Sequence, residues 1–103
     1  MIEDLTPQEF QQSIEAESNI LIDVREKFEL DICKINGAIS MPMSSITETF
    51  SDLDPSLSYS LYCHHGMRSM KVANFLLSKG FQSLSNLKGG IDAWSREIDN
   101  AVE

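Results

Sequence analysis

The seven residues Cys63 to Ser69, CHHGMRS, bring together several side chains that can take part in chemistry. Their cysteine is a candidate nucleophile, because the thiolate form of a cysteine attacks electrophiles. Gly66 permits a turn conformation that other residues rarely adopt, and Arg68 adds a permanent positive charge with forked N–H donors. The common alternative is an inert cysteine that serves as a small hydrophobe at a strand end. The combination of residues within one short stretch favours an activated nucleophile whose substrate is an anion.

The residues on either side of this stretch predict a strand before it and a helix after it. Ser58 to Cys63 alternates and then becomes apolar, and the apolar residues at 72, 75 and 76 have helical spacing. We expect this helix to begin near Arg68 or Ser69. A tight loop between the end of a strand and the start of a helix turns successive backbone N–H groups inward, which forms an anion-binding nest. Cys63 is therefore the predicted catalytic residue, at the centre of such a nest.

The other residues of the loop form the predicted substrate-binding set: His64, His65, Gly66, Met67, Arg68 and Ser69. Either the two histidines add positive charge to the rim of the site, or they are ordinary exposed residues. Arg68 either faces the substrate or points outward, where it would bind an acceptor or form a structural salt bridge. No metal site is expected, because adjacent histidines on a tight loop rarely converge on one ion and no CxxC or HxxxH partner is present.

The rest of the chain alternates predicted helices and strands. Thr6 to Glu9 forms a capping box with proline at the first helical position, which predicts a helix start, and this helix is expected to end near Asn19. Further strands are predicted at 19–24, 37–42, 58–63 and 81–87, and further helices at 27–30, 44–50, 68–79 and 90–98. This alternation indicates an α/β fold with a mainly parallel sheet, in a single domain over residues 1–103.

The composition excludes several classes of protein. The net charge of -8 argues against nucleic acid and anionic membranes as partners. No apolar run is long enough to span a membrane, and the acidic start of the chain does not resemble a secretory signal, so we expect a cytoplasmic protein whose two cysteines are thiols.

The charges are unevenly distributed along the chain. Residues 1–54 contain 12 of the 16 acidic residues, whereas Pro55 to Ile91 contains no Asp or Glu at all. This acid-free segment contributes Arg68 and three lysines. It predicts either a local positive site that suits a small anion, or merely a solvated basic face.

Four segments occur in an order that resembles a known family: LIDVRE at 21–26, CKINGAISMP at 33–42, CHHGMRS at 63–69 and LKGGIDAW at 87–94. They are similar to the D-V-R segment, the G-H-I-P-G-A element, the C-x-x-G-x-R-S loop and the L-x-G-G-x-x-A-W ending of the rhodanese-like (sulfurtransferase) domains. The resemblance implies a rhodanese-like three-layer fold, with a sheet of about five strands flanked by helices and a persulfide carried on Cys63. The sequence departs from the family pattern at Cys33, Lys34 and Asn36.

The length of the loop separates sulfur transfer from phosphate chemistry. Phosphatases of the dual-specificity cell-cycle type and arsenate reductases resemble rhodaneses in fold, but those phosphatases use C-x5-R, which gives a wider cradle for phosphate. Cys63 to Arg68 is C-x4-R, the shorter loop associated with sulfur substrates. The sequence also shows no obvious aspartic general acid near the loop. A phosphatase is therefore the less favoured interpretation.

The resemblance thus implies a thiosulfate sulfurtransferase-like enzyme with a covalent cysteine persulfide and no metal or organic cofactor. Its partners would be a small sulfur-containing anion, such as thiosulfate, and a sulfur-donor or sulfur-acceptor protein. We expect Asp23 and Arg25 to form a buried or half-buried polar support beneath the loop, and Cys33 is a minor candidate for a resolving thiol. The alternative is a non-catalytic module of the same fold that binds or regulates a partner.

Overall fold

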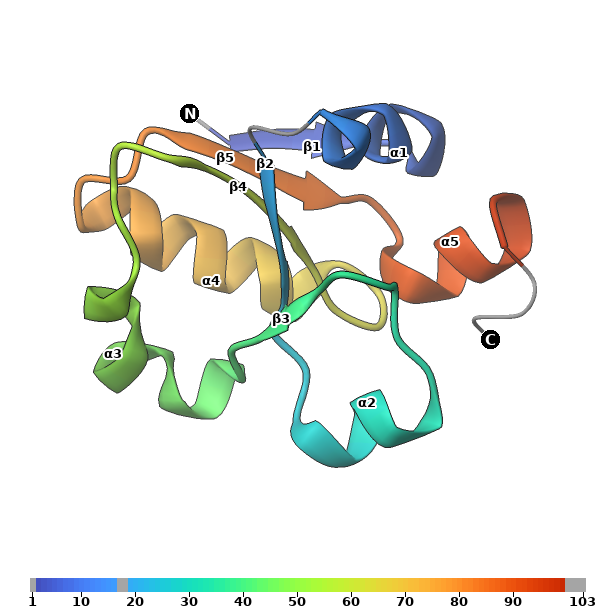
Figure 1. Cartoon of the computed structure of the whole chain (residues 1–103), viewed down its shortest axis with the longest axis horizontal. Coiled ribbons are helices and arrows are strands. Elements are labelled where there is room, and N and C mark those ends of the chain that lie inside the picture. Colours follow the sequence, from blue (N-terminus) through green and yellow to red (C-terminus); the bar gives the residue numbers. More distant parts are fainter. Residues whose placement is uncertain (1, 17–18, 100–103) are drawn as a thin grey trace.

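The computed structural model describes residues 2–16 and 19–99. The helices and strands alternate as predicted (Figure 1). In chain order they are β1 (Ile2–Leu5), α1 (Pro7–Glu15), β2 (Asn19–Asp23), α2 (Lys27–Ile32), β3 (Ile39–Ser40), α3 (Ile46–Thr49), β4 (Ser58–Tyr62), α4 (Met67–Ser78), β5 (Ser83–Leu87) and α5 (Gly90–Glu97). Two short 3-10 turns, at 43–45 and 50–52, flank α3.

The five strands form one parallel sheet in the order β1-β5-β4-β2-β3, which confirms the predicted fold class. The local sequence patterns did not predict the first strand. β1 lies at the edge of the sheet and exposes Glu3 and Asp4, so it has no apolar run that would reveal a strand. Its position is set by pairing with β5, in which Leu5 lies opposite Leu87.

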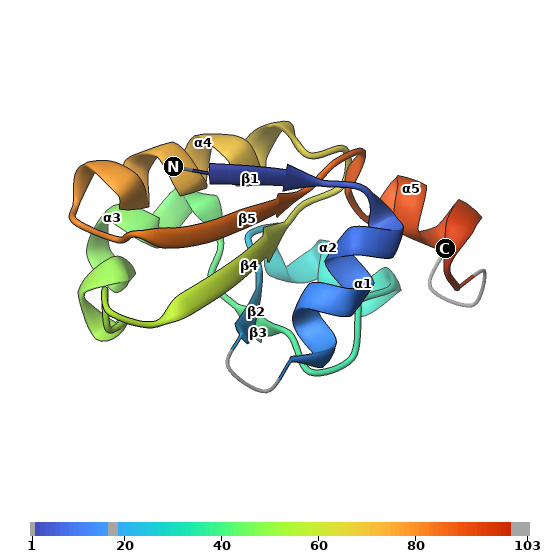
Figure 2. The same cartoon turned by 90° about the horizontal axis from the view of Figure 1, so that it is seen from above.

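Helices cover both faces of the sheet and produce two buried clusters. On one face α4 packs against β1, β4 and β5, and on the other α1 contacts β2, β5 and α5. Figure 2 shows α4 and α1 separated by the sheet. Adjacent residues of β2 divide between the clusters: Leu21 belongs with Trp94 of α5, and Ile22 with Leu76 of α4. This alternation is the two-residue period of a strand that is buried on both faces, and it creates the three layers.

Some predicted boundaries are wrong, and each has a local cause. The capping box at the start of α1 is confirmed, since Thr6 and Glu9 exchange hydrogen bonds of 2.9 and 3.2 Å. The helix ends at Glu15, however, because Asn19 begins β2 and donates its side-chain amide to the Ser13 carbonyl at 2.8 Å.

The segment between β3 and β4 is less regular than predicted. The strand expected at 37–42 is reduced to Ile39–Ser40, at the edge of the sheet and shortly before Pro42, which cannot donate to a ladder. The helix expected at 44–50 is interrupted by the flanking 3-10 turns. Among the described residues, no helix combines the length and the apolar character needed to cross a membrane.

Candidate active site

Cys63 lies directly after β4, and three donor groups lie within hydrogen-bonding distance of its sulfur. The backbone N–H of Gly66 is 3.1 Å from Sγ, the hydroxyl of Ser69 is 3.3 Å away, and the backbone N–H of Ser69 is 3.4 Å away. The residue is only 1% exposed. Donors that converge on a sulfur stabilise its anionic form, because a charged acceptor strengthens each hydrogen bond. The geometry therefore suits a thiolate held at the base of the loop.

Two features of the loop bring these N–H groups onto the sulfur. α4 begins at Met67, slightly earlier than predicted, so the first helical turn directs otherwise unpaired N–H groups at Cys63. Gly66 precedes the helix with φ +96°, a conformation that favours glycine. A Cβ at this position would lie 3.1 Å from the carbonyl oxygen of Leu87, which leaves little space for a side chain.

The start of α5 holds the same loop from the other side. The backbone N–H of Ile91 donates to the Cys63 carbonyl at 2.8 Å, and that of Asp92 donates to the His64 carbonyl at 3.1 Å. Gly90 packs so closely that an added Cβ would lie 2.2 Å from the His64 carbonyl oxygen. Figure 1 shows the loop before α4 beside the first turn of α5. The nucleophile loop is thus fixed by the N-terminal turns of two helices.

Ser69 connects Cys63 to a buried asparagine that sequence reasoning missed. Its hydroxyl lies within hydrogen-bonding distance of both the Cys63 sulfur and the side-chain oxygen of Asn86. The Asn86 amide nitrogen donates to Asp4 at 3.0 Å and to the Gly66 carbonyl at 3.3 Å, which turns its oxygen toward Ser69. A hydroxyl has one proton, so the sulfur and the asparagine oxygen compete for it. Asn86 therefore positions the hydroxyl that contacts the nucleophile.

Arg68 forms an ion pair with Glu29 of α2. Of the orientations predicted for Arg68, the structure therefore has the one in which it forms a structural salt bridge. Its Nη1 and Nη2 atoms each donate to one carboxylate oxygen at 2.8 Å. The hydrogen bonds from Arg68 lower the pKa of Glu29 to about 2, and the carboxylate raises the pKa of Arg68. The acid-free segment around Arg68 does not make an unpaired positive charge here, because an acidic residue from the first half of the chain neutralises it.

Asp23 and Arg25 form a second ion pair, buried at the end of β2. Asp23 is 0% exposed and Arg25 is 3% exposed, and the closest contact between their side chains is 2.8 Å. Arg25 also donates to the Cys33 carbonyl at 2.7 Å. Burial opposes the charge on Arg25, but the hydrogen bonds and charge of Asp23 outweigh burial and raise its pKa. The pair is buried as predicted, and its role as a support for the loop stays a prediction.

His64, His65 and Asp92 form a cluster of possible metal ligands. Their donor atoms lie within 4.8 Å of one another, and the two imidazole rings stack with centroids 4.0 Å apart. The third donor was not foreseen, because it comes from α5. Zinc would require the atoms to move closer, since Zn–N distances are about 2.0–2.1 Å. Arg96 competes for Asp92, with which it forms a hydrogen-bonded ion pair.

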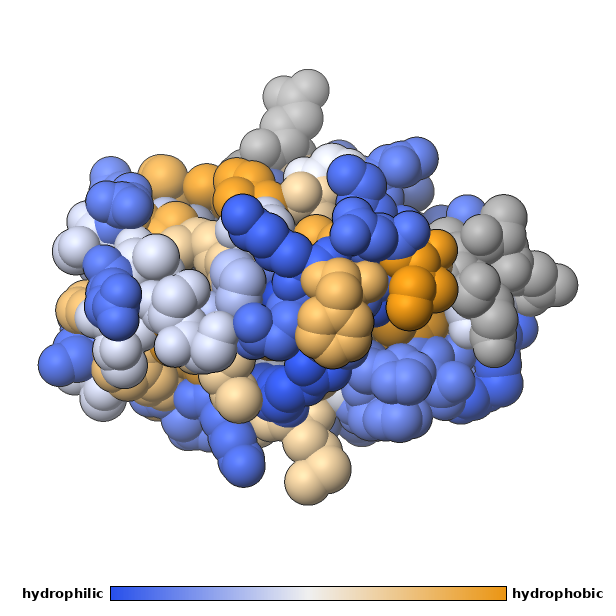
Figure 3. All heavy atoms as spheres, turned by 90° about the horizontal axis from the view of Figure 1, so that it is seen from below, coloured by the Kyte–Doolittle hydropathy of each residue, from blue (hydrophilic) through white to orange (hydrophobic). Residues whose placement is uncertain are grey.

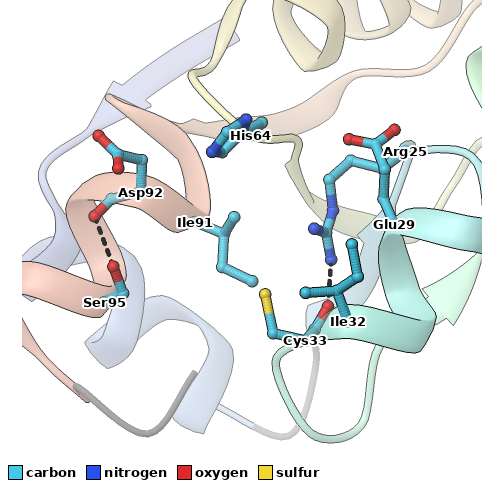
Figure 4. A pocket seen from close by; sticks show the side chains of 8 residues that line it. All are labelled: Arg25, Glu29, Ile32, Cys33, His64, Ile91, Asp92 and Ser95. Carbon is cyan, nitrogen blue, oxygen red and sulfur yellow. Dashed lines mark hydrogen bonds between the residues drawn. The ribbon is translucent and has the colours of Figure 1, made fainter. Parts of the chain in front are cut away.

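Two clefts border the nucleophile loop. The first, here called the α2 cleft, has a volume of about 200 Å³ and is lined by Arg25, Glu29, Ile32, Cys33, His64, Ile91, Asp92 and Ser95. Figure 4 shows the Cys33 sulfur directed into this cleft. The second, here called the lysine cleft, has a volume of about 390 Å³ and is lined by Asp4, His65, Gly66, Met67, Met70, Lys71, Asn86, Lys88 and Gly89. Of the predicted site residues in the loop, His64 lines the α2 cleft, three line the lysine cleft (His65, Gly66 and Met67), and three line neither (Cys63, Arg68 and Ser69).

The structure places acidic groups near the loop that the sequence did not reveal. Glu29 reaches it through Arg68, and Asp92 lies beside His64 and His65. A general acid must carry a proton near neutral pH. The pKa of Glu29 is lowered by Arg68 and that of Asp92 is lowered by Arg96, so both remain ionised. These carboxylates therefore give no support to a phosphatase mechanism.

The family model and the relatives that match this chain all point to the same protein family. The family model described as "Rhodanese-like domain" matches residues 6–97. YtwF of Bacillus subtilis, which carries a sulfurtransferase name, is 36% identical over 97 residues, which cover 93% of this chain and 93% of YtwF. The chloroplastic rhodanese-like/PpiC domain-containing protein 12 of Arabidopsis thaliana is 38% identical over 86 residues. That match covers 80% of this chain but only 29% of the plant protein.

The fold is also similar to solved structures. The crystal structure of a rhodanese-related protein from Thermoplasma volcanium has a TM-score of 0.83 and is 29% identical in sequence, and the match covers 93% of each chain. The structural similarity therefore extends over nearly the whole chain, and the residues matched by the family model include β4, the nucleophile loop and α4.

Proposed function

Because this chain belongs to the rhodanese-like domain family of sulfurtransferases, we propose that it transfers sulfane sulfur through a persulfide on Cys63. The observation that supports this proposal is the set of donors around the Cys63 sulfur, two backbone N–H groups and the Ser69 hydroxyl, at 3.1 to 3.4 Å. In a persulfide the negative charge lies on the terminal sulfur, and we expect the N–H groups of the same loop to stabilise it in the manner of an oxyanion hole.

The first step loads the enzyme. The Cys63 thiolate attacks the outer sulfur of the donor, so that an S–S bond forms to Cys63 while the S–S bond of the donor breaks. The electron pair leaves on the inner sulfur of the donor, as sulfite from thiosulfate or as a thiolate from a persulfide. No outside oxidant or reductant is needed. Donors are small sulfur-containing anions or the persulfide of a partner protein.

The second step returns the enzyme to its starting form. A thiol, a carrier protein or, in an assay, cyanide attacks the terminal sulfur of the persulfide. The Cys63 thiolate is the leaving group, and the loop donors stabilise it again. The chemistry requires no metal or organic cofactor, and we expect it to take place in the cytoplasm.

A second candidate function is a module that binds a partner without catalysis. It is favoured by α2, which buries none of its residues and leaves Phe28 68% exposed and Ile32 77% exposed. Exposed apolar side chains that gather on one helix are typical of interaction surfaces. Such a module would not depend on the thiol of Cys63.

The intact mass of the reduced protein before and after incubation with thiosulfate tests the proposal, with Cys63→Ser as the control. We expect one added sulfur atom on the wild type, removable by cyanide and absent from the variant. A cysteine desulfurase serves as a second donor. Failure of both donors to add sulfur would contradict the proposed function and favour the interaction module.

A further inference from the structure

The charged groups that line the α2 cleft each have a partner of opposite charge. Arg25 pairs with Asp23, Glu29 with Arg68, and Asp92 with Arg96. A small anion that enters this cleft therefore meets no uncompensated positive charge from arginine. This differs from the usual design of an anion site, in which unpaired cations attract the ligand.

Of these pairs, Arg68–Glu29 is nearest to the nucleophile in sequence, because Arg68 lies in the first turn of α4 directly after the loop, and its partner Glu29 lines the α2 cleft. Both of its Nη atoms donate to Glu29, in the bidentate geometry that arginine forms with a carboxylate. The pair is only partly exposed, with side-chain exposures of 32% for Arg68 and 17% for Glu29. A thiosulfate dianion would have to displace or approach a carboxylate in order to use this arginine.

The walls of the α2 cleft are suited to a less charged donor. Ile32 and Ile91 line it with apolar surface, and Phe28 stands exposed on the same helix as Ile32. Figure 3 shows apolar side chains among hydrophilic ones on the face that α2 forms. Apolar contacts favour the organic part of a thiol-borne persulfide, which thiosulfate lacks.

We propose that Glu29 is a specificity-determining residue, which holds Arg68 away from anions and so favours organic persulfides over thiosulfate as sulfur donors. This inference rests on the proposed function. Thiosulfate carries two negative charges, whereas an organic persulfide carries at most one. In the preferred reaction the Cys63 sulfur bonds to the outer sulfur of R–S–S⁻, the S–S bond of the donor breaks, and R–S⁻ leaves with the electron pair and takes a proton from water.

The test compares the rates at which Cys63 gains sulfur from thiosulfate and from the persulfide of 2-mercaptoethanol, measured by rapid quenching and intact mass. In Glu29→Gln, which keeps the size of the side chain, Arg68 is free to face an anion. We expect loading from thiosulfate to rise about tenfold while loading from the persulfide changes by less than about twofold. The change in the ratio between variants is decisive, because the intrinsic reactivity of each donor cancels.

Two controls isolate the ion pair. Asp31→Asn removes one exposed negative charge from the same helix and should leave the ratio of the two rates unchanged. Adding Arg68→Gln to Glu29→Gln should abolish the gain with thiosulfate. Thermal unfolding of each variant establishes that it is folded.

The outcomes separate this inference from the proposed function. If Glu29→Gln gains sulfur but keeps the wild-type ratio, or if Asp31→Asn gives the same increase, the role of Glu29 is wrong and the sulfurtransferase function stands. If neither donor loads Cys63 in any folded variant, the proposed function itself is wrong and the inference fails with it.

Discussion

The two clefts beside the nucleophile loop differ in how their charges are compensated. In the α2 cleft, Arg25 and Glu29 each belong to an ion pair. In the lysine cleft, Lys71 and Lys88 are exposed, and neither forms an ion pair with a described residue. The lysine cleft does contain acid, since Asp4 lines it and Glu9 interacts electrostatically with Lys88. The two sides of the loop therefore differ in whether the fold pairs their charges directly, as in the α2 cleft, or leaves them without a direct ion pair to a described residue.

The largest expected effect comes from breaking the buried pair beneath the α2 cleft. Asp23→Asn leaves the Arg25 charge buried without its partner, and we expect the free energy of unfolding to fall by about 3–5 kcal/mol. Chemical denaturation measures this change. As the control from the other cleft, Lys71→Gln should change it by less than about 0.5 kcal/mol. Equal effects of the two substitutions would show that the clefts do not differ in this way.

A smaller effect is expected at the base of the lysine cleft. Asn86→Ala removes the acceptor of the Ser69 hydroxyl and the donor to Asp4 and the Gly66 carbonyl. We expect a loss of about 1–3 kcal/mol of stability, together with slower sulfur loading of Cys63. Asn74→Ala is a matched control, because Asn74 is exposed and, among the described residues, its side chain donates to a carbonyl of its own helix alone. If a folded Asn86→Ala variant loads sulfur onto Cys63 at the wild-type rate, Asn86 does not have the positioning role described above.

The smallest expected effect is the contribution of Glu29 to the pH dependence of the free energy of unfolding. Its pKa is lowered from 4.5 to about 2 in the folded protein, so its ionised form stabilises the fold above pH 4.5 and this stabilisation is lost as the pH falls toward 2. The free energy of unfolding of the wild type should therefore exceed that of Glu29→Gln at pH 6, with a difference that shrinks between pH 5 and pH 2. A difference independent of pH would contradict the ion pair. Measurements at steps of about one pH unit are sufficient, because the loss of stabilisation is spread over the interval between the unfolded and the folded pKa of Glu29.

Local patterns were sufficient for the elements that carry the nucleophile. The alternation before Cys63, the glycine of the turn and the apolar spacing after it predicted a strand, a tight loop and a helix, and the structure has all three. The capping box at Thr6 was also identified, because it depends on residues three apart. The boundaries at Asn19 and around α3 were wrong, since backbone pairing and turns there override the local preferences.

The nucleophile loop follows from local sequence, because a turn and the first turn of a helix are built from neighbouring residues. Which distant groups contact that loop depends instead on how the separate elements pack together. Glu29 on Arg68, Asn86 on Ser69 and Asp92 beside the two histidines are contacts between separate elements. Their formation depends on the strand order and on the packing of helices against the sheet. Neither can be predicted from the periodicity of a local stretch of sequence. The sequence therefore predicts where the nucleophile lies, whereas the fold determines which charged and polar side chains surround it.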